Sequence, residues 1–138
     1  MPHQAKALVL HCLDFRFIHE IVHFMKQRGL LDQYDDVSVA GAAKNLVDPN
    51  HPTDREFILR QIKIAKHLHQ IEEVIIINHR DCGAYGKIFP DESAEIERHR
   101  ADLIEAKKLV QQTAPDVRVG TFLATLERKG GVAFKEIH

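Results

Sequence analysis

"EEVIIINHRDCG", residues 72–83, contains the strongest strand pattern of the chain, a run of valine and isoleucine. His79 and Cys82 follow this run and stand three positions apart. The pair is either half of a metal site or part of a polar turn that closes a hydrophobic strand. The remaining sequence is needed to choose between these interpretations.

The composition is that of an ordinary globular protein. The chain has 138 residues, 44% hydrophobic and 28% charged, with a formal net charge of -1. This length fits a single domain over residues 1–138. The charge gives no reason to expect binding to nucleic acid or to an anionic membrane. The amino-terminal apolar run is too short for a signal sequence, and no segment has the length of a membrane span, so we expect a cytoplasmic protein.

Strand and helix patterns alternate along the chain. The expected strands cover residues 6–12, 35–41, 72–78, 116–127 and 130–137. The expected helices cover residues 17–30, 53–69 and 91–114, with Gly29 as a C-cap and Thr53 or Asp54 as an N-cap. This order predicts an α/β fold with three layers. Its mainly parallel sheet should have the strand order 2-1-3-4, with strand 5 as an antiparallel edge.

In such a sheet the ligand site lies beyond the carboxyl ends of the strands, where the winding reverses. Cys12 ends the first expected strand and His79 ends the third, so both should emerge at this point. Cys82 can fold back from the turn as a third ligand, with Gly83 allowing the tight turn. Two thiolates and one imidazole suit Zn²⁺ and leave a fourth position open. The alternatives are ordinary packing of Cys12 and His79, or a disulfide between the two cysteines.

Asp14 and Arg16 follow Cys12 at intervals of two. In an extended segment these three side chains would face the same cleft. The Asp14 carboxylate could bind the metal as a fourth ligand, or orient a water molecule on the metal. Arg16 favours the second role because it can hold the carboxylate with two parallel hydrogen bonds. A plain ion pair at a strand end is the alternative.

"CLDFR" at 12–16 and "HRDCG" at 79–83 resemble the Cys-x-Asp-x-Arg and His-x-x-Cys-Gly motifs of the β-class carbonic anhydrases. "SVAGA" at 38–42 and "VRVGTFLATL" at 117–126 are similar to two further stretches of that family. The resemblance implies that Cys12, His79 and Cys82 bind zinc. It also implies that Asp14 and Arg16 form a catalytic pair, and that zinc-bound hydroxide hydrates CO₂ reversibly to bicarbonate. A homodimer or a higher homo-oligomer is expected as well.

Phe15 departs from this resemblance, because the family commonly has serine between the aspartate and the arginine. A bulky apolar residue there could narrow or dry the site. Hydrolysis of CS₂ or COS by the same metal set is therefore an alternative reaction. A zinc domain without turnover, closed by Asp14, is a second alternative.

Overall fold

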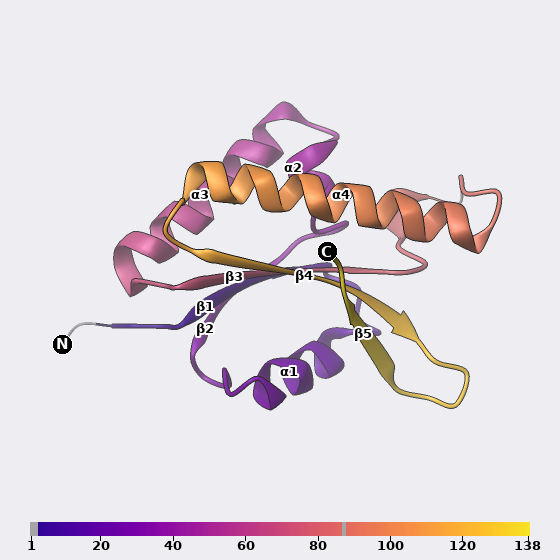
Figure 1. Ribbon diagram of the computed structural model, residues 1–138, viewed down its shortest axis with the longest axis horizontal. Coiled ribbons are helices and arrows are strands. Elements are labelled where there is room, and N and C mark those ends of the chain that lie inside the picture. Colours follow the sequence, from indigo (N-terminus) through magenta and orange to yellow (C-terminus); the bar gives the residue numbers. More distant parts are fainter. Residues whose placement is uncertain (1–2, 87) are drawn as a thin grey trace.

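The computed structural model describes residues 3–86 and 88–138, which form a five-stranded sheet (Figure 1). The strands are β1 (Ala7–His11), β2 (Tyr34–Ser38), β3 (Glu73–His79), β4 (Arg118–Leu126) and β5 (Val132–Glu136). Their order is β2-β1-β3-β4-β5, and every pair is parallel except β4 with β5. The predicted strand order and the antiparallel edge are confirmed.

Helices cover both faces of the sheet and complete the three layers. They are α1 (Ile18–Gln27), α2 (Lys44–Val47), α3 (Pro52–His69) and α4 (Glu92–Thr113), with a 3₁₀ turn η1 (Gly83–Tyr85). Helix α1 lies alone on one face, and α2, α3 and α4 lie on the other (Figure 1). Among the described residues, no helix combines the length and the apolar character that a bilayer span requires.

The two faces of β1 explain why its residues 7–10 are continuously hydrophobic. Leu8 and Leu10 belong to the core beneath α2, α3 and α4, whereas Ala7 and Val9 belong to the core beneath α1. Successive side chains of a strand point to opposite faces, so a strand covered on both sides needs apolar residues at every position. All five residues of β1 are buried.

The ends of two helices differ from the predicted positions. Helix α3 begins earlier than expected, with His51 as the N-cap and Pro52 in the first turn. Proline suits this position because its fixed φ is helical and its missing N–H has no helical partner there. The N-cap expected at Thr53 or Asp54 is therefore wrong. The C-cap of helix α1 is Arg28, one residue before the predicted cap Gly29. Gly29 follows it at a φ of 76°.

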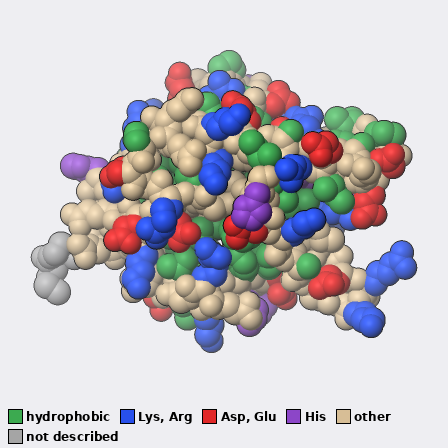
Figure 2. Space-filling model, viewed as in Figure 1, with side chains coloured by type: hydrophobic (Ala, Val, Ile, Leu, Met, Phe, Trp, Pro, Cys, Tyr) green, Lys and Arg blue, Asp and Glu red, His purple; other side chains and the backbone are tan. Residues whose placement is uncertain are grey.

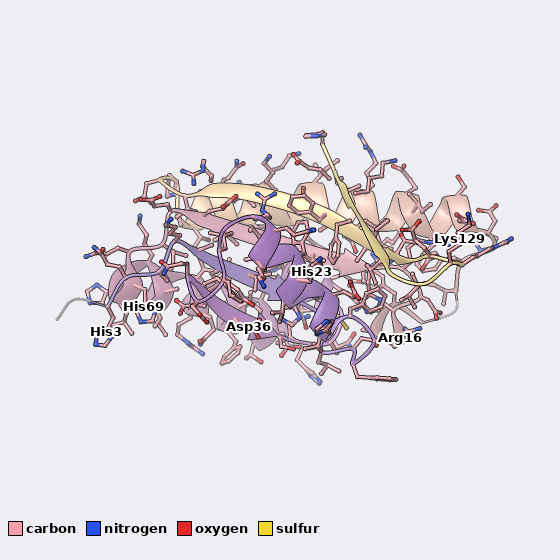
Figure 3. All side chains as sticks on the ribbon, turned by 90° about the horizontal axis from the view of Figure 1, so that it is seen from below. His3, Arg16, His23, Asp36, His69 and Lys129 are labelled. Carbon is pink, nitrogen blue, oxygen red and sulfur yellow. The ribbon has the colours of Figure 1, made fainter. Side chains whose placement is uncertain are left out.

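The register of the parallel strands brings the predicted ligands to one edge of the sheet. His11 of β1 is opposite Ile77 of β3, and β3 continues to His79, so Cys12 and His79 leave the sheet together. Figure 3 shows Arg16 at this end of the molecule and His69 at the other. On the face shown in Figure 2, acidic and basic side chains are interspersed.

Candidate metal centre

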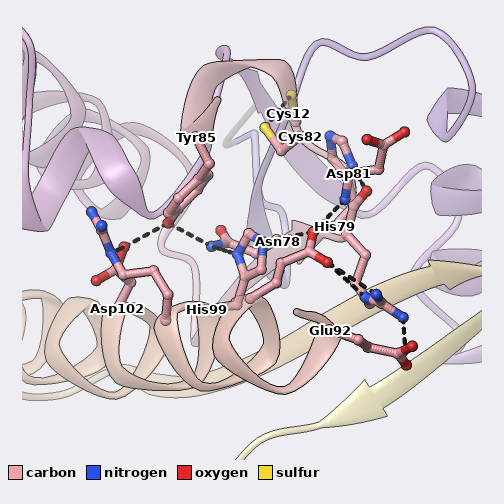
Figure 4. A network of polar contacts seen from close by, with 12 residues as sticks. Cys12, Asn78, His79, Asp81, Cys82, Tyr85, Glu92, His99 and Asp102 are labelled. Carbon is pink, nitrogen blue, oxygen red and sulfur yellow. Dashed lines mark hydrogen bonds and ion pairs between the residues drawn. The ribbon is translucent and has the colours of Figure 1, made fainter. Parts of the chain in front are cut away.

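Cys12, His79 and Cys82 converge at the carboxyl ends of β1 and β3. Their potential ligand atoms lie within 4.8 Å of one another, and all three residues are buried (Figure 4). The two sulfur atoms are 3.9 Å apart and both cysteines are free, so the disulfide alternative does not describe this structure. The structure therefore brings together the three residues that the sequence singled out, and they form a candidate metal site.

The His79 ring is held with one nitrogen free for a metal. Its Nδ1 donates a hydrogen bond to the Arg80 carbonyl at 2.7 Å, because a carbonyl can only accept. The ring also stacks on Phe17, with 4.3 Å between the ring centroids. The buried Nε2 has no hydrogen-bond partner among the described residues. A buried polar atom left unpaired is costly, and a metal ion at this position would satisfy it.

The sulfur separation also fits a metal ion. Two thiolates about 2.3 Å from a tetrahedral zinc ion would lie about 3.8 Å apart, close to the 3.9 Å between Cys12 Sγ and Cys82 Sγ. The hydrogen bond between the two thiols lowers the pKa of Cys12 to about 4 and raises the pKa of Cys82. Removal of the first proton from the pair is thus favoured, which suits binding of a cation.

Gly41, in the stretch after β2, contacts the Cys12 thiol through its backbone. Its backbone N–H lies 3.5 Å from Cys12 Sγ and donates to it. Gly41 has a φ of 86°, and a Cβ at this position would lie 3.0 Å from the Ala84 Cβ. Only glycine fits both the left-handed backbone and this close approach. The "SVAGA" stretch thus contributes a backbone donor to the site.

Asp14 and Arg16 form an ion pair beside the cysteine and histidine side chains. The Asp14 carboxylate accepts hydrogen bonds from Arg16 Nη2 at 2.7 Å, from Arg16 Nε at 3.1 and 3.2 Å, and from the Arg16 backbone N–H at 2.9 Å. Asp14 Oδ2 is 3.7 Å from His79 Nε2. The hydrogen bonds from Arg16 lower the pKa of Asp14 to about 2, so this carboxylate is ionised at neutral pH.

The backbone around this pair is not extended as expected. Phe15, Arg16 and Phe17 form a turn, and this turn aims the guanidinium back at Asp14. The reason is local, because the Asp14 side chain accepts the N–H of the residue two positions on, as aspartate commonly does in turns. The predicted pairing is present, but the extended segment assumed for it is wrong.

A pocket of about 460 Å³ opens beside Cys12 and Asp14. It is lined by Cys12, Leu13, Asp14, Phe15, Ala40, Gly83 and Ala84. Most of these side chains are apolar, and Asp14 provides the one carboxylate among them. Phe15 is 86% exposed. Its ring therefore borders the open pocket and does not fill it.

The tight turn before Cys82 depends on Asp81 and not on Gly83. Asp81 has a φ of 57°, in the left-handed region, whereas Gly83 begins η1 without a positive φ. A Cβ at Gly83 would meet no atom within 4 Å. Aspartate tolerates the left-handed region better than most residues do, which explains how this turn forms without glycine.

A buried polar network that the sequence did not predict lies next to His79 (Figure 4). Asn78 Nδ2 donates to the Tyr85 hydroxyl at 2.9 Å and to His99 Nδ1 at 3.0 Å. The Tyr85 hydroxyl donates to Asp102 Oδ2 at 2.7 Å, and the Ala43 N–H donates to Asn78 Oδ1 at 3.0 Å. This network ties the end of β3 to η1, to the N-cap of α2 and to α4, so it fixes the backbone next to a candidate ligand.

The buried stripe of α4 could have indicated part of this network. Its buried residues are His99, Asp102, Leu103, Ala106 and Val110, at helical spacing. The first two of these residues, His99 and Asp102, are polar, and the helix is highly charged. The apolar pattern is therefore hard to recognise in the sequence. His11, at the end of β1, is also buried, and its Nε2 bonds Asp36 Oδ1 at 2.7 Å.

His99 should make folding stability depend on pH. Burial lowers its pKa to about 4, and the nearby Glu95 carboxylate opposes this shift only in part. An unfolded chain has a histidine pKa of about 6.5, so the unfolded state binds the proton first as the pH falls. The stability due to neutral His99 is therefore complete above about pH 6.5 and lost towards pH 4.

We expect the parent to lose about 2 kcal/mol more than His99→Gln between pH 7.5 and pH 5. Urea unfolding of both proteins at the two pH values, in one zinc-containing buffer, measures this difference. Equal losses would show that folded His99 takes up its proton as readily as the unfolded residue does.

The chain is similar to known proteins over most of its length. The family model described as "Putative carbonic anhydrase" matches residues 2–128. The chain belongs to this carbonic anhydrase family. It is 37% identical over 129 residues to an uncharacterized protein of Rickettsia bellii, covering 90% of this chain and 79% of that protein. It is 34% identical over 129 residues to one of Rickettsia conorii, covering 90% and 69%.

Two solved structures share the carbonic anhydrase fold. The carbonic anhydrase from Streptococcus mutans superposes with a TM-score of 0.63 at 17% identity, over 100% of this chain and 86% of that one. The β-carbonic anhydrase CafD of Aspergillus fumigatus gives 0.59 at 14% identity, over 100% and 91%. At these identities the two structures establish that the chain has the β-carbonic anhydrase fold.

Proposed function

We propose that this protein is a zinc-dependent carbonic anhydrase, a lyase that interconverts CO₂ and bicarbonate. One observation carries the proposal: two thiols and an unpartnered imidazole nitrogen converge beside an ionised Asp14–Arg16 pair in a member of this family. The two solved neighbours, carbonic anhydrases by name, support the same reaction.

Cys12, His79 and Cys82 would hold the zinc ion, because their donor atoms and spacing suit tetrahedral coordination. When bound, zinc supplies a Lewis acid that makes water nucleophilic near neutral pH. Three protein ligands leave a fourth position for the reacting water. The pocket lined by Leu13, Phe15 and other small or apolar residues opens onto Cys12 and Asp14, where it can admit a small apolar substrate.

Asp14 would orient the reacting water. Its carboxylate is ionised and can only accept hydrogen bonds, so it favours one direction of the water's O–H. Arg16 binds both carboxylate oxygens and thereby holds Asp14 away from the ligand position. If Asp14 moved onto the metal instead, the site would be closed and the domain would be catalytically silent.

Assembly and location belong to the same proposal. We expect residues 1–138 to act as a single domain within a homodimer or a higher homo-oligomer. Leu13 and Phe15, 59% and 86% exposed at the mouth of the pocket, give an apolar surface for contact between copies. A cytoplasmic location suits the two free thiols, because that compartment keeps them reduced.

Stopped-flow CO₂ hydration by zinc-loaded protein tests the proposal. We expect the parent to accelerate hydration and Asp14→Ala to lower kcat/KM about 10- to 100-fold. Asp116→Ala is the matched control, because this carboxylate pairs with Lys66 at 2.8 Å, immediately before β4 and thus at the amino end of the strands. It should leave kcat/KM unchanged.

Zinc-loaded parent without CO₂ hydration would contradict the proposed reaction. Parallel assays with CS₂ and COS identify the alternative substrates, since both are small and apolar enough for the same pocket. A parent that holds zinc but turns over none of the three would be the silent zinc domain.

A further inference from the structure

Two residues, Arg80 and Asp81, separate His79 from Cys82, and both need support. Asp81 adopts a left-handed φ of 57°, which is unfavourable for a residue with a side chain. The Arg80 carbonyl is the acceptor that orients the His79 ring. Any movement of this two-residue loop would therefore displace the imidazole and the neighbouring thiol together.

Glu95, on the first turn of α4, holds both loop residues. Its Oε2 accepts the Asp81 backbone N–H at 2.6 Å. Its Oε1 accepts Arg80 Nε at 3.1 Å and Arg80 Nη2 at 3.0 Å. The Glu95 side chain is only 12% exposed. The buried His99 Nε2 lies 3.9 Å from Glu95 Oε2, beyond hydrogen-bond distance.

The same loop also holds Arg16 of the proposed catalytic pair, Asp14 and Arg16. Arg16 Nη2 donates to the Asp81 carbonyl at 2.9 Å, and Arg16 Nη1 donates to the Asp81 carboxylate at 3.0 Å. Arg16 also holds Asp14. The position of Asp81 thus fixes the guanidinium that orients Asp14.

Glu92, the first residue of α4 and three positions before Glu95, offers a contrast (Figure 4). Within residues 3–86 and 88–138 its side chain bonds only Arg80 Nη1, at 2.9 Å, and it is 68% exposed. It makes no hydrogen bond to Asp81 among the described residues. The two glutamates therefore share one partner, but only Glu95 reaches the backbone between the ligands.

We propose that Glu95 is a positioning residue of the metal centre, acting through Arg80 and Asp81 on His79 and on the Arg16–Asp14 pair. This inference rests on the proposed zinc function. Glu95→Gln tests it, because the amide has the size of the carboxylate but presents an N–H₂ group to one of two sets of N–H donors. Either Asp81 or Arg80 then loses its acceptor and faces a donor.

We expect Glu95→Gln to raise the zinc dissociation constant about 10- to 100-fold and to change the visible spectrum of the cobalt(II)-substituted protein. Glu92→Gln is the matched control and should change neither. Competition with a chromophoric chelator measures the affinity, and circular dichroism verifies the fold. Arg80→Gln approaches the contact from its other side and should weaken zinc binding in the same direction.

A folded Glu95→Gln or Arg80→Gln variant with the parent's zinc affinity and cobalt spectrum would overturn the role of Glu95 while leaving the zinc site intact. Equal weakening by Glu92→Gln would also overturn it, because the effect would then come from charge on α4 alone. A parent that binds no zinc would instead contradict the proposed function itself, and the inference with it.

Discussion

Replacing Cys82 by serine should remove nearly all bound zinc. We expect about one zinc per chain in the parent, as a three-ligand site requires. The variant should bind zinc more than about 100-fold less tightly, beyond the usual effect of a change outside the ligands. Serine keeps the size of the side chain but offers no thiolate, so CO₂ hydration should fall to background with the metal content. Elemental analysis after dialysis measures the zinc.

The control for this experiment is His19→Gln. His19 lies exposed on α1 and does not belong to the described cluster, so its loss should leave one zinc per chain. A Cys82→Ser protein that kept the parent's zinc content after dialysis would show that the metal binds elsewhere, and the proposed ligand set would be wrong.

Replacing Phe17 by alanine should lower the free energy of unfolding by about 3–5 kcal/mol. Phe17 is 1% exposed and belongs to the core between α1 and the sheet. Its ring also stacks on His79. The substitution therefore opens a cavity in the core and beside the imidazole. Urea denaturation of the zinc-loaded proteins gives the stability, and chelator competition gives the accompanying loss of zinc affinity.

Phe57→Ala provides the comparison. Phe57 lies on α3 and is 46% exposed, so the same change of side chain removes far less buried surface. We expect less than half of the loss seen for Phe17→Ala and no effect on zinc affinity. Equal losses at the two positions would mean that Phe17 does not contribute through burial.

The sheet was predictable because the hydrophobic pattern of a strand reflects whether one or both of its faces are buried. Residues 74–77 are apolar throughout, and they are buried on both faces as the central strand β3. The convergence of Cys12 and His79 followed from the rule for parallel sheets. Backbone details were not predictable in this way. The turn at Arg16 depends on hydrogen bonds to Asp14, and the left-handed turn falls on Asp81.

The support behind the site was hidden for a different reason. Glu95 and His99 lie in a segment whose charges predict an exposed helix face, and sequence gives no distance between α4 and the loop after β3. Their roles depend on where α4 packs on the sheet, which is a tertiary property. In the same way, nothing in "GAY" at 83–85 indicates that Tyr85 bonds Asp102, an α4 residue seventeen positions further along the chain.

The pairing of β1 with β3 also sets when the metal centre can form. Cys12 and His79 come from segments separated by α1, β2, α2 and α3, and only the register of this parallel pair brings them together. A contact that closes so long a loop, such as the pairing of β1 with β3, forms slowly because of its entropy cost. On the ribosome, Cys12 therefore emerges long before its two partners, and the complete site appears only after Cys82 has left the exit tunnel. All three ligands are therefore available together only once β1 has paired with β3.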